Sequence, residues 1–246
     1  MARLLTDLFF WCSFLGIVGT LTVLVGHLLF FGSPHRDAPK EPKSIRRMSL
    51  AERGIHACLM LGFLSLAVTG FASVLFFKTP ITGWIRSLHV LMAPCFVLGL
   101  AASALRWSQT CCFQEYDWEW VRRFGGYLEG HPEVPAGRFN AGQKVYFWTI
   151  LPLGILATLS GLSRAFPMFH ENVQLWILQI HRYTCLLLLL LVISHIYLGT
   201  LANPGTIQVI FTGRVHATWA KQHHPLWWES LHEKETSMQE DRSHRT

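Results

Sequence analysis

His181 and His195 lie fourteen residues apart in one apolar stretch, HRYTCLLLLLLVISHIY. Fourteen residues are two heptads, so both imidazoles project from nearly the same face of a helix. At 1.5 Å per residue they are about 21 Å apart along the axis, which places one near each edge of a bilayer core about 30 Å thick. A histidine in lipid needs a polar partner, so both are candidate functional residues.

Two more histidines, His56 and His89, stand at the ends of other apolar segments and could complete two pairs. Paired histidines at two depths of a helix bundle suit two stacked b-type haems. Ligation by two histidines fills both axial positions of the iron, which favours electron transfer over oxygen binding. The alternative is that each histidine is a packed polar residue, hydrogen-bonded across helices. We interpret His27 in that way, and His131, His170 and the tail histidines as solvated.

The composition is that of a membrane protein. Hydrophobic residues make up 51% of the chain and charged residues 15%, below the roughly 25% charged residues of soluble domains. We therefore predict an all-α membrane protein with five transmembrane helices in one integral domain. The apolar runs cover residues 8–31, 57–77, 87–105, 145–163 and 173–203.

The first run could instead be a cleaved signal peptide. It is longer than the usual apolar region of about 7–15 residues, and no small-x-small cleavage site follows it. The sequence FFGSPHRDAPK after it is typical of a helix that ends in a Pro-rich linker. We favour a retained helix.

Basic residues in the short loops predict the orientation in the membrane. They concentrate after the first helix, between the third and fourth helices, and in the tail, which lie on one side if there are five spans. We place that side in the cytoplasm and the N-terminus outside. The net charge of +6 follows from this bias and does not require nucleic-acid binding. The basic residues of these three stretches are Arg36, Lys40, Lys43, Arg46, Arg47, Arg53, Arg106, Arg122, Arg123, Arg138, Lys144, Arg214, Lys221, Lys234, Arg242 and Arg245, against Lys78, Arg86 and Arg164 in the opposite connections.

This orientation assigns a depth to each of the four histidines. His56 opens the second helix and His195 lies late in the fifth, so both are near the cytoplasmic edge. His89 and His181 begin helices that run inward, so both are near the outer edge. The sequence therefore predicts an inner pair, His56 with His195, and an outer pair, His89 with His181.

From residue 50 to about residue 230 the chain resembles the cytochrome b (gamma) subunits of membrane-bound formate dehydrogenases. The matching motifs are RGIHACLM, SLHVLMAP, RFNAGQKVYFW, LQIHRY, ISHIYLG and GRVHATWAKQHHPLWWE. The resemblance implies a four-helix dihaem cytochrome b bundle, to which this chain adds an N-terminal transmembrane helix. We divide the chain into the extra helix and linker (1–49), the dihaem, quinone-binding domain (50–212) and a cytoplasmic tail (213–246).

The resemblance also implies a function and partners. Two b haems would use the inner and outer histidine pairs. Electrons from formate would arrive outside through an iron–sulfur (beta) subunit, with a molybdenum- or tungsten-containing (alpha) subunit oxidising the formate. They would reduce a quinone, menaquinone or ubiquinone, on the cytoplasmic side of a bacterial inner membrane. The quinone pocket would include Asn140, Gly142 and Gln143, with His195 close by.

The NAGQK segment suits that role. Asn140 and Gln143 offer neutral donors for a quinone carbonyl, and Gly142 permits close approach of the backbone. The alternative is a helix N-terminus capped by Asn140, and both descriptions can hold together. Lys144 could add a positive field, but we favour an ordinary charge of the cytoplasmic membrane edge.

The remaining motifs leave more than one interpretation open. Arg53, Arg86, Arg164 and Arg182 could pair with haem propionates or simply reach the interface. The segment FQEYDWEWVRRFGGYLEG is typical of a headgroup-level anchor and could cover a quinone entrance. The six cysteines contain no C-x-x-C, so iron–sulfur ligands belong to other subunits.

Three other functions compete with the formate assignment. The same dihaem scaffold could serve a hydrogenase or a thiosulfate or polysulfide reductase. A transporter or proton channel could use the histidines as relays, although the sequence has no internal repeat. A plain membrane anchor with structural histidines is the third. Absence of haem would favour the last two.

Overall fold

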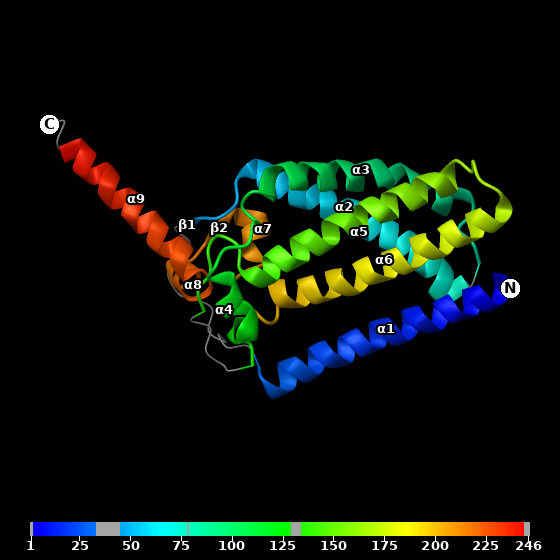
Figure 1. The fold of residues 1–246 in the computed structure, drawn as a ribbon, viewed down its shortest axis with the longest axis horizontal. Helices are drawn as coiled ribbons and strands as arrows, with labels where there is room; N and C mark the ends of the chain where they lie inside the picture. Colours follow the sequence, from blue (N-terminus) through cyan, green and yellow to red (C-terminus); the bar gives the residue numbers. More distant parts are fainter. Residues whose placement is uncertain (1, 33–44, 78, 129–133, 244–246) are drawn as a thin grey trace.

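Five long apolar helices dominate the structure, a computed structural model that describes residues 2–32, 45–77, 79–128 and 134–243. Each is long and apolar enough to cross a membrane, which confirms the predicted all-α membrane fold. Figure 1 shows them lying side by side along the long axis of the molecule. They are α1 (Ala2–Phe30), α2 (Leu50–Ala72), α3 (Gly83–Trp107), α5 (Ala141–Ala165) and α6 (Glu171–Gly199), and the π-helical turn η1 (Ser73–Phe77) continues α2.

The outer surface of the helices is apolar, as a lipid-facing surface must be. Leu105 is 88% exposed and Phe30 is 85% exposed. In water such a surface would drive aggregation, whereas in a bilayer it matches the solvent.

Helices α2 and α3 pack unusually closely because glycines lie at their contact. A Cβ on Gly62 would lie 2.6 Å from the backbone nitrogen of Phe96, and one on Gly99 would lie 2.9 Å from that of Leu59. Small residues permit such close approach of helix backbones in membranes. The connection between them is short, so α2 and α3 form an antiparallel pair that positions His56 and His89.

Helix α1 packs along α6 (Figure 1). Its contact face contains Phe9 and Ser13, which are buried, and Gly16, where a Cβ would lie 3.3 Å from Leu190. Near the other end of α1 the ring nitrogen Nδ1 of His27 lies 2.6 Å from the Tyr197 hydroxyl. His27 is thus a polar residue hydrogen-bonded across helices, in line with its interpretation from the sequence.

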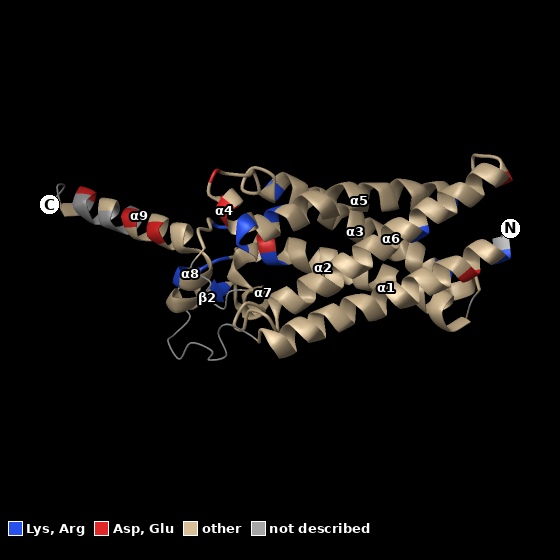
Figure 2. Cartoon of the chain, turned by 60° about the horizontal axis from the view of Figure 1, so that its bottom comes forward, with Lys and Arg blue, Asp and Glu red and all other residues tan. Residues whose placement is uncertain are grey.

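The short elements gather at one end of the bundle, which we call the basic end. Here β1 and β2 pair antiparallel, with Ile45 opposite Val215. Val215, Trp219 and their neighbours form a small apolar core beneath the strands. Figure 2 shows lysines and arginines around α4, β2 and α8 at this end. The elements are α4 (Asp117–Arg122), the 3-10 turn η2 (Phe124–Gly126), α7 (Gln208–Thr212), β1 (Ile45–Arg46), β2 (Arg214–Val215), α8 (Ala217–His223) and α9 (Pro225–Ser243), which projects away from the bundle.

The tail is therefore folded against the segment that precedes α2, because β2 and α8 pack on β1. Several residues that entered the sequence predictions lie outside the described part of the chain. They are Arg36, Lys40, Lys43, Lys78, His131 and Arg245.

Candidate functional site

The inner histidine pair meets in the bundle near the basic end. The ring centroids of His56 on α2 and His195 on α6 are 6.3 Å apart, with an angle of 39° between the rings. Imidazole nitrogens bind first-row metals at about 2.0–2.1 Å, and each nitrogen lies about 1.1 Å from its ring centre. Two imidazoles on opposite sides of one iron atom therefore have centroids about 6 Å apart. The observed spacing fits one metal between the rings.

The outer histidine pair lies toward the other end of the same helices. His89 Nδ1 is 2.7 Å from the Thr69 hydroxyl oxygen, and that hydroxyl donates to the Ser65 carbonyl at 2.6 Å. Because its own hydrogen is used, the Thr69 oxygen accepts from His89. The nitrogen Nδ1 of His89 therefore carries the proton, and Nε2 keeps a free lone pair for a metal.

His181 is held in the same tautomer. Its Nδ1 lies 3.1 Å from the Ala157 carbonyl, which can only accept, and 3.2 Å from the Ser160 hydroxyl. A histidine that donates Nδ1–H to a second group is the usual arrangement of a metal ligand.

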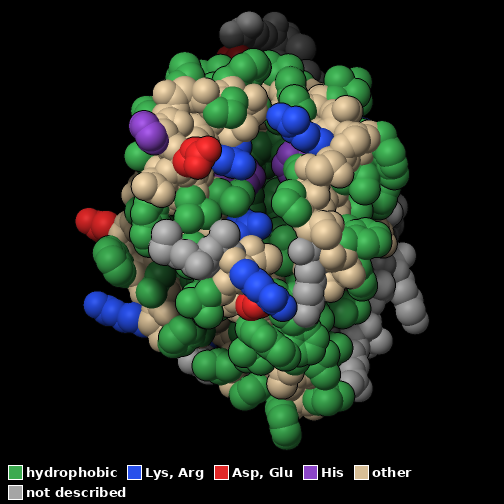
Figure 3. Space-filling view, turned by 90° about the vertical axis from the view of Figure 1, so that its right-hand side faces the viewer, with side chains coloured by type: hydrophobic (Ala, Val, Ile, Leu, Met, Phe, Trp, Pro, Cys, Tyr) green, Lys and Arg blue, Asp and Glu red, His purple; other side chains and the backbone are tan. Residues whose placement is uncertain are grey.

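Space beside the outer imidazoles is provided by glycines. A Cβ on Gly161 would lie 3.1 Å from the His181 ring, and one on Gly70 would lie 3.5 Å from the His89 ring. Figure 3 looks onto the end of the molecule opposite the basic end, and it shows histidine atoms inside a hollow with lysine or arginine atoms at its edge. The residues present thus fit a b haem at the outer pair as well as at the inner pair.

The NAGQK segment caps α5. Asn140 Oδ1 accepts from the Gln143 amide at 2.9 Å, and Gln143 Oε1 accepts from the Asn140 amide at 3.1 Å. This is a capping box, so both side-chain oxygens are used by the backbone. The two side-chain NH₂ groups are left as donors.

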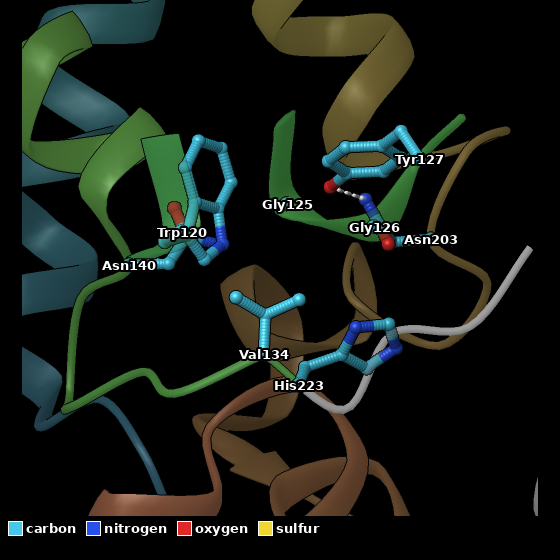
Figure 4. Close-up of a pocket in the computed structure, with 8 residues that line it drawn as sticks. All are labelled: Trp120, Gly125, Gly126, Tyr127, Val134, Asn140, Asn203 and His223. Carbon is cyan, nitrogen blue, oxygen red and sulfur yellow. Dashed lines mark hydrogen bonds between the residues drawn. The ribbon is translucent and has the colours of Figure 1, made fainter. Parts of the chain in front are cut away.

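Gly142 is in close contact with an aromatic ring. A Cβ on Gly142 would lie 2.5 Å from the indole of Trp120, so this ring covers the glycine. Figure 4 shows Asn140 and Trp120 on one side of a small pocket and Asn203 and Tyr127 on the other. Its volume of about 20 Å³ suffices for about one water molecule and not for a quinone ring.

Lys144 is not an exposed charge of the membrane edge, contrary to the interpretation that we favoured from the sequence. It is 1% exposed, and its Nζ lies 2.6 Å from Oδ2 of Asp117, which is also 1% exposed. A buried ammonium requires such a partner, because burial removes its hydration. The pair joins α4 to the first turn of α5.

A second buried carboxylate joins three other segments. Glu52 accepts from Arg138 at 2.7 Å and from Arg106 at 2.9 Å, and it closes the capping box of α2 with Ser49. The motif Ser49-x-x-Glu52 is recognisable in the sequence as a helix start. The pairing of Glu52 with the two arginines is not recognisable from the sequence. Together with Lys144–Asp117, this cluster fixes the loop geometry around NAGQK.

His224 is buried, whereas the sequence interpretation placed the tail histidines in solvent. It is 1% exposed, with Nε2 3.0 Å from an Arg47 guanidinium nitrogen and Nδ1 2.7 Å from the Gly137 carbonyl. Since Arg47 only donates, Nε2 accepts and Nδ1 carries the proton. Burial and the neighbouring Arg47 charge hold the pKa of His224 well below its usual value. Burial lowers the pKa of Arg47 to about 9.

The four interfacial arginines do not share one environment. Arg53 donates to the Ile210 and Phe211 carbonyls and so ties α2 to α7. Arg164 bonds the side chain of Gln174 at 3.1 Å. Arg182 lies over the Phe9 ring, and Arg86 is exposed. Arg164, Arg182 and Arg86 belong to the end that carries the outer pair.

Tyr146 is a residue of this region that the sequence analysis missed. Its ring stacks on the imidazole of His195, with centroids 4.6 Å apart and an angle of 11°. Tyr146 stands on α5, three residues after Gln143. Residues three apart share one face of a helix, so Tyr146 lies on the same face of α5 as Gln143. It lies within the matching motif RFNAGQKVYFW, but nothing in that motif distinguishes it from the neighbouring Phe147 and Trp148.

Apolar spanning helices that hold two histidine pairs at different depths define a membrane cytochrome b. The sequence pattern of the prokaryotic cytochrome b561 family matches residues 47–213. This match covers more than half of the 246 residues, and the chain belongs to that family. Membership implies that it binds haem b.

Curated relatives are cytochrome subunits of formate dehydrogenases. The chain is 26% identical over 215 residues to the nitrate-inducible formate dehydrogenase cytochrome b556(Fdn) subunit of Escherichia coli K12, which covers 81% of this chain and 97% of the relative. It is 26% identical over 206 residues to the cytochrome b556(fdo) subunit of the same organism, covering 78% and 95%. A formate dehydrogenase cytochrome b556 subunit of Haemophilus influenzae matches half of its length at 28% identity.

Proposed function

We propose that this protein is the membrane cytochrome b subunit of a respiratory formate dehydrogenase. In this account, electrons from an iron–sulfur subunit outside the membrane cross through two b haems to a quinone on the cytoplasmic side. His89 and His181 would hold the outer haem, and His56 and His195 the inner one. Formate oxidation itself would occur on a molybdenum- or tungsten-containing subunit. The observation that carries the proposal is the 6.3 Å spacing of the inner imidazole rings.

The orientation proposed from the sequence places the basic end in the cytoplasm and the N-terminus outside. The charge distribution supports it, because the described lysines and arginines concentrate around α4, β2 and α8 (Figure 2). Basic loops are retained in the cytoplasm during insertion. The electron donor would then meet the outer histidine pair.

A groove between α5 and α6 supports quinone binding. It extends along α6 from Leu187 to Ser194, the residue before His195, has a volume of about 630 Å³, and is mostly apolar. An apolar groove of that size suits a ligand that arrives from the lipid. Its lining residues are Trp148, Thr149, Pro152, Leu153, Leu187, Leu190, Leu191 and Ser194.

The chain supplies donors at the start of α5. The NH₂ groups of Asn140 and Gln143 are not used by the capping box, and they can donate to a quinone carbonyl as it gains charge. Reduction of a quinone takes two electrons and two protons. With electrons from outside and protons from the cytoplasm, the reaction would contribute to a proton motive force.

The experiment is to purify the membrane complex with wild-type, His56→Ala or His27→Ala subunits. We expect His56→Ala to lose the inner haem and formate-dependent quinol formation, while formate still reduces the outer haem. His27→Ala changes a histidine outside both pairs, and it should retain both haems. Equal loss of both haems in a folded His56→Ala complex would contradict separate pairs. The dehydrogenase subunits that copurify test the electron donor.

A further inference from the structure

The two histidine pairs are oriented in different ways. In the outer pair, hydrogen bonds from Nδ1 to Thr69 and to Ala157 hold both imidazoles. In the inner pair, Nδ1 of His56 is buried without a hydrogen-bond partner among the described residues. The His195 ring also makes no hydrogen bond within the described residues. The contacts that orient the inner rings therefore differ from those of the outer pair.

Tyr146 provides that contact for His195. Its ring lies nearly parallel to the imidazole, at 11°, with centroids 4.6 Å apart. Stacked rings at this separation attract each other and favour the parallel orientation of the imidazole. The tyrosine is fixed in turn by α5, whose first turn is held by the capping box of Asn140 and Gln143.

We propose that Tyr146 is the positioning residue of the inner site, where its ring sets the plane of the His195 imidazole. The inference rests on the proposed function, because it concerns a ligand of the inner haem. Tyr146 touches His195 and would act on the metal through this histidine. The ring matters for this role, and the hydroxyl does not, since no hydrogen bond of the Tyr146 hydroxyl occurs within the described residues.

Two consequences follow from stacking in place of hydrogen bonding. Removing the ring frees the rotation of the His195 imidazole, which alters the electronic state of the iron it binds. Removing the Thr69 hydroxyl has the corresponding effect on His89, and only there, because Thr69 bonds the outer ring. Each variant should therefore perturb one haem and leave the other unchanged.

The test uses the purified membrane complex with Tyr146→Phe, Tyr146→Leu and Tyr146→Met, and with Thr69→Val as the matched outer variant. The readouts are the low-spin ferric EPR signals and the midpoint potentials of the two haems. We expect Tyr146→Phe to match the wild type, because it keeps the ring. Tyr146→Leu and Tyr146→Met should shift only the signal and potential of the inner haem, and Thr69→Val only those of the outer haem.

Several results would overturn the proposal. Unchanged inner-haem signals in both non-aromatic variants would show that the Tyr146 ring does not position the His195 imidazole. A shift in Tyr146→Phe as large as in Tyr146→Leu would assign the effect to the hydroxyl. Loss of both haems in the two non-aromatic variants would indicate a structural role only. A wild-type complex without two b haems would overturn the proposed function together with this inference.

Discussion

Two buried carboxylates at the basic end are paired with basic side chains. Lys144 and Asp117 are joined at 2.6 Å, and Glu52 is shared by Arg138 and Arg106. A buried pair adds little stability over an apolar replacement, but the loss of one partner leaves an uncompensated charge. The role of these pairs is therefore to fix the geometry of the loops that surround NAGQK.

We expect Lys144→Met to destabilise the protein by about 3–5 kcal/mol, because Asp117 is left buried without its partner. The double variant Lys144→Met with Asp117→Leu removes both charges and should regain most of that loss. Thermal unfolding of the purified protein in detergent measures both effects. If Lys144→Met were as stable as the wild type, the buried Asp117 carboxylate would not require Lys144 as its partner.

The position of some residues could be predicted from the sequence, while the burial of others could not, and the difference has a physical reason. His56 and His195 stand in apolar spans, where helix geometry and loop charge fix the depth of every residue. Lys144 stands at the very start of such a span and His224 outside them, where the same residue types occur both solvated and buried. Only the tertiary contacts with Asp117 and Arg47 distinguish the two states.

At the scale of the elements, α1 is attached to the bundle through α6. Gly16 lies at this contact, because a Cβ added to it would be 3.3 Å from Leu190. A Cβ added to Gly19 would have no atom within 4 Å. Both glycines are within the same helix, so a substitution changes their helix propensity equally. The two positions therefore separate packing from propensity.

We expect Gly16→Leu to weaken the α1–α6 contact by about 1–3 kcal/mol through overpacking. Gly19→Leu is the matched control and should not weaken it. Thermal unfolding in detergent, with protease sensitivity of the segment after α1, reports the difference. Equal behaviour of the two variants would argue against the packing of α1 on α6.

The tail is a second element whose attachment can be tested, because His224 docks it through Arg47 and Gly137. The pKa of His224 is lowered on folding, so the unfolded tail binds more protons than the docked tail below the usual histidine pKa of about 6.5. Docking is fully stable above that pH and loses stability as the pH falls below it.

We therefore expect the protection factors of residues 217–227 against hydrogen exchange to fall as the pH falls from about 7 to 5, once the slower intrinsic exchange at low pH is taken into account. In His224→Gln this fall in protection should be absent, because the amide does not titrate. Identical profiles for the two proteins would exclude His224 as the titrating group.

At the scale of the whole molecule, sidedness decides whether the reaction separates charge. Two adjacent cysteines offer a probe at the basic end. Cys112 is exposed, whereas Cys111 is buried and burial raises the pKa of its thiol to about 11. The thiolate is the reactive form, so an impermeant maleimide should select Cys112.

We expect the maleimide to label Cys112 in inverted membrane vesicles and not in intact spheroplasts. Cys112→Ser should lose this labelling, and Cys111→Ser should keep it. Labelling of Cys112 from the outside would reverse the proposed orientation and place quinone reduction on the outer face.

The arrangement of the whole molecule follows from the separation of its two histidine pairs along one bundle. Helix α6 holds one histidine of each pair, and α2 and α3 hold the partners. In the proposed account, electrons cross the membrane through the groups that these histidines would hold. The proposed path therefore depends on the presence of two haems.

The most direct measurement is the haem content of the purified protein. A reduced-minus-oxidised visible spectrum with pyridine haemochromogen quantitation gives the number of b haems per chain. The account predicts about two, one for each pair of axial histidine ligands. A well-folded preparation with one b haem, or with none, would contradict it.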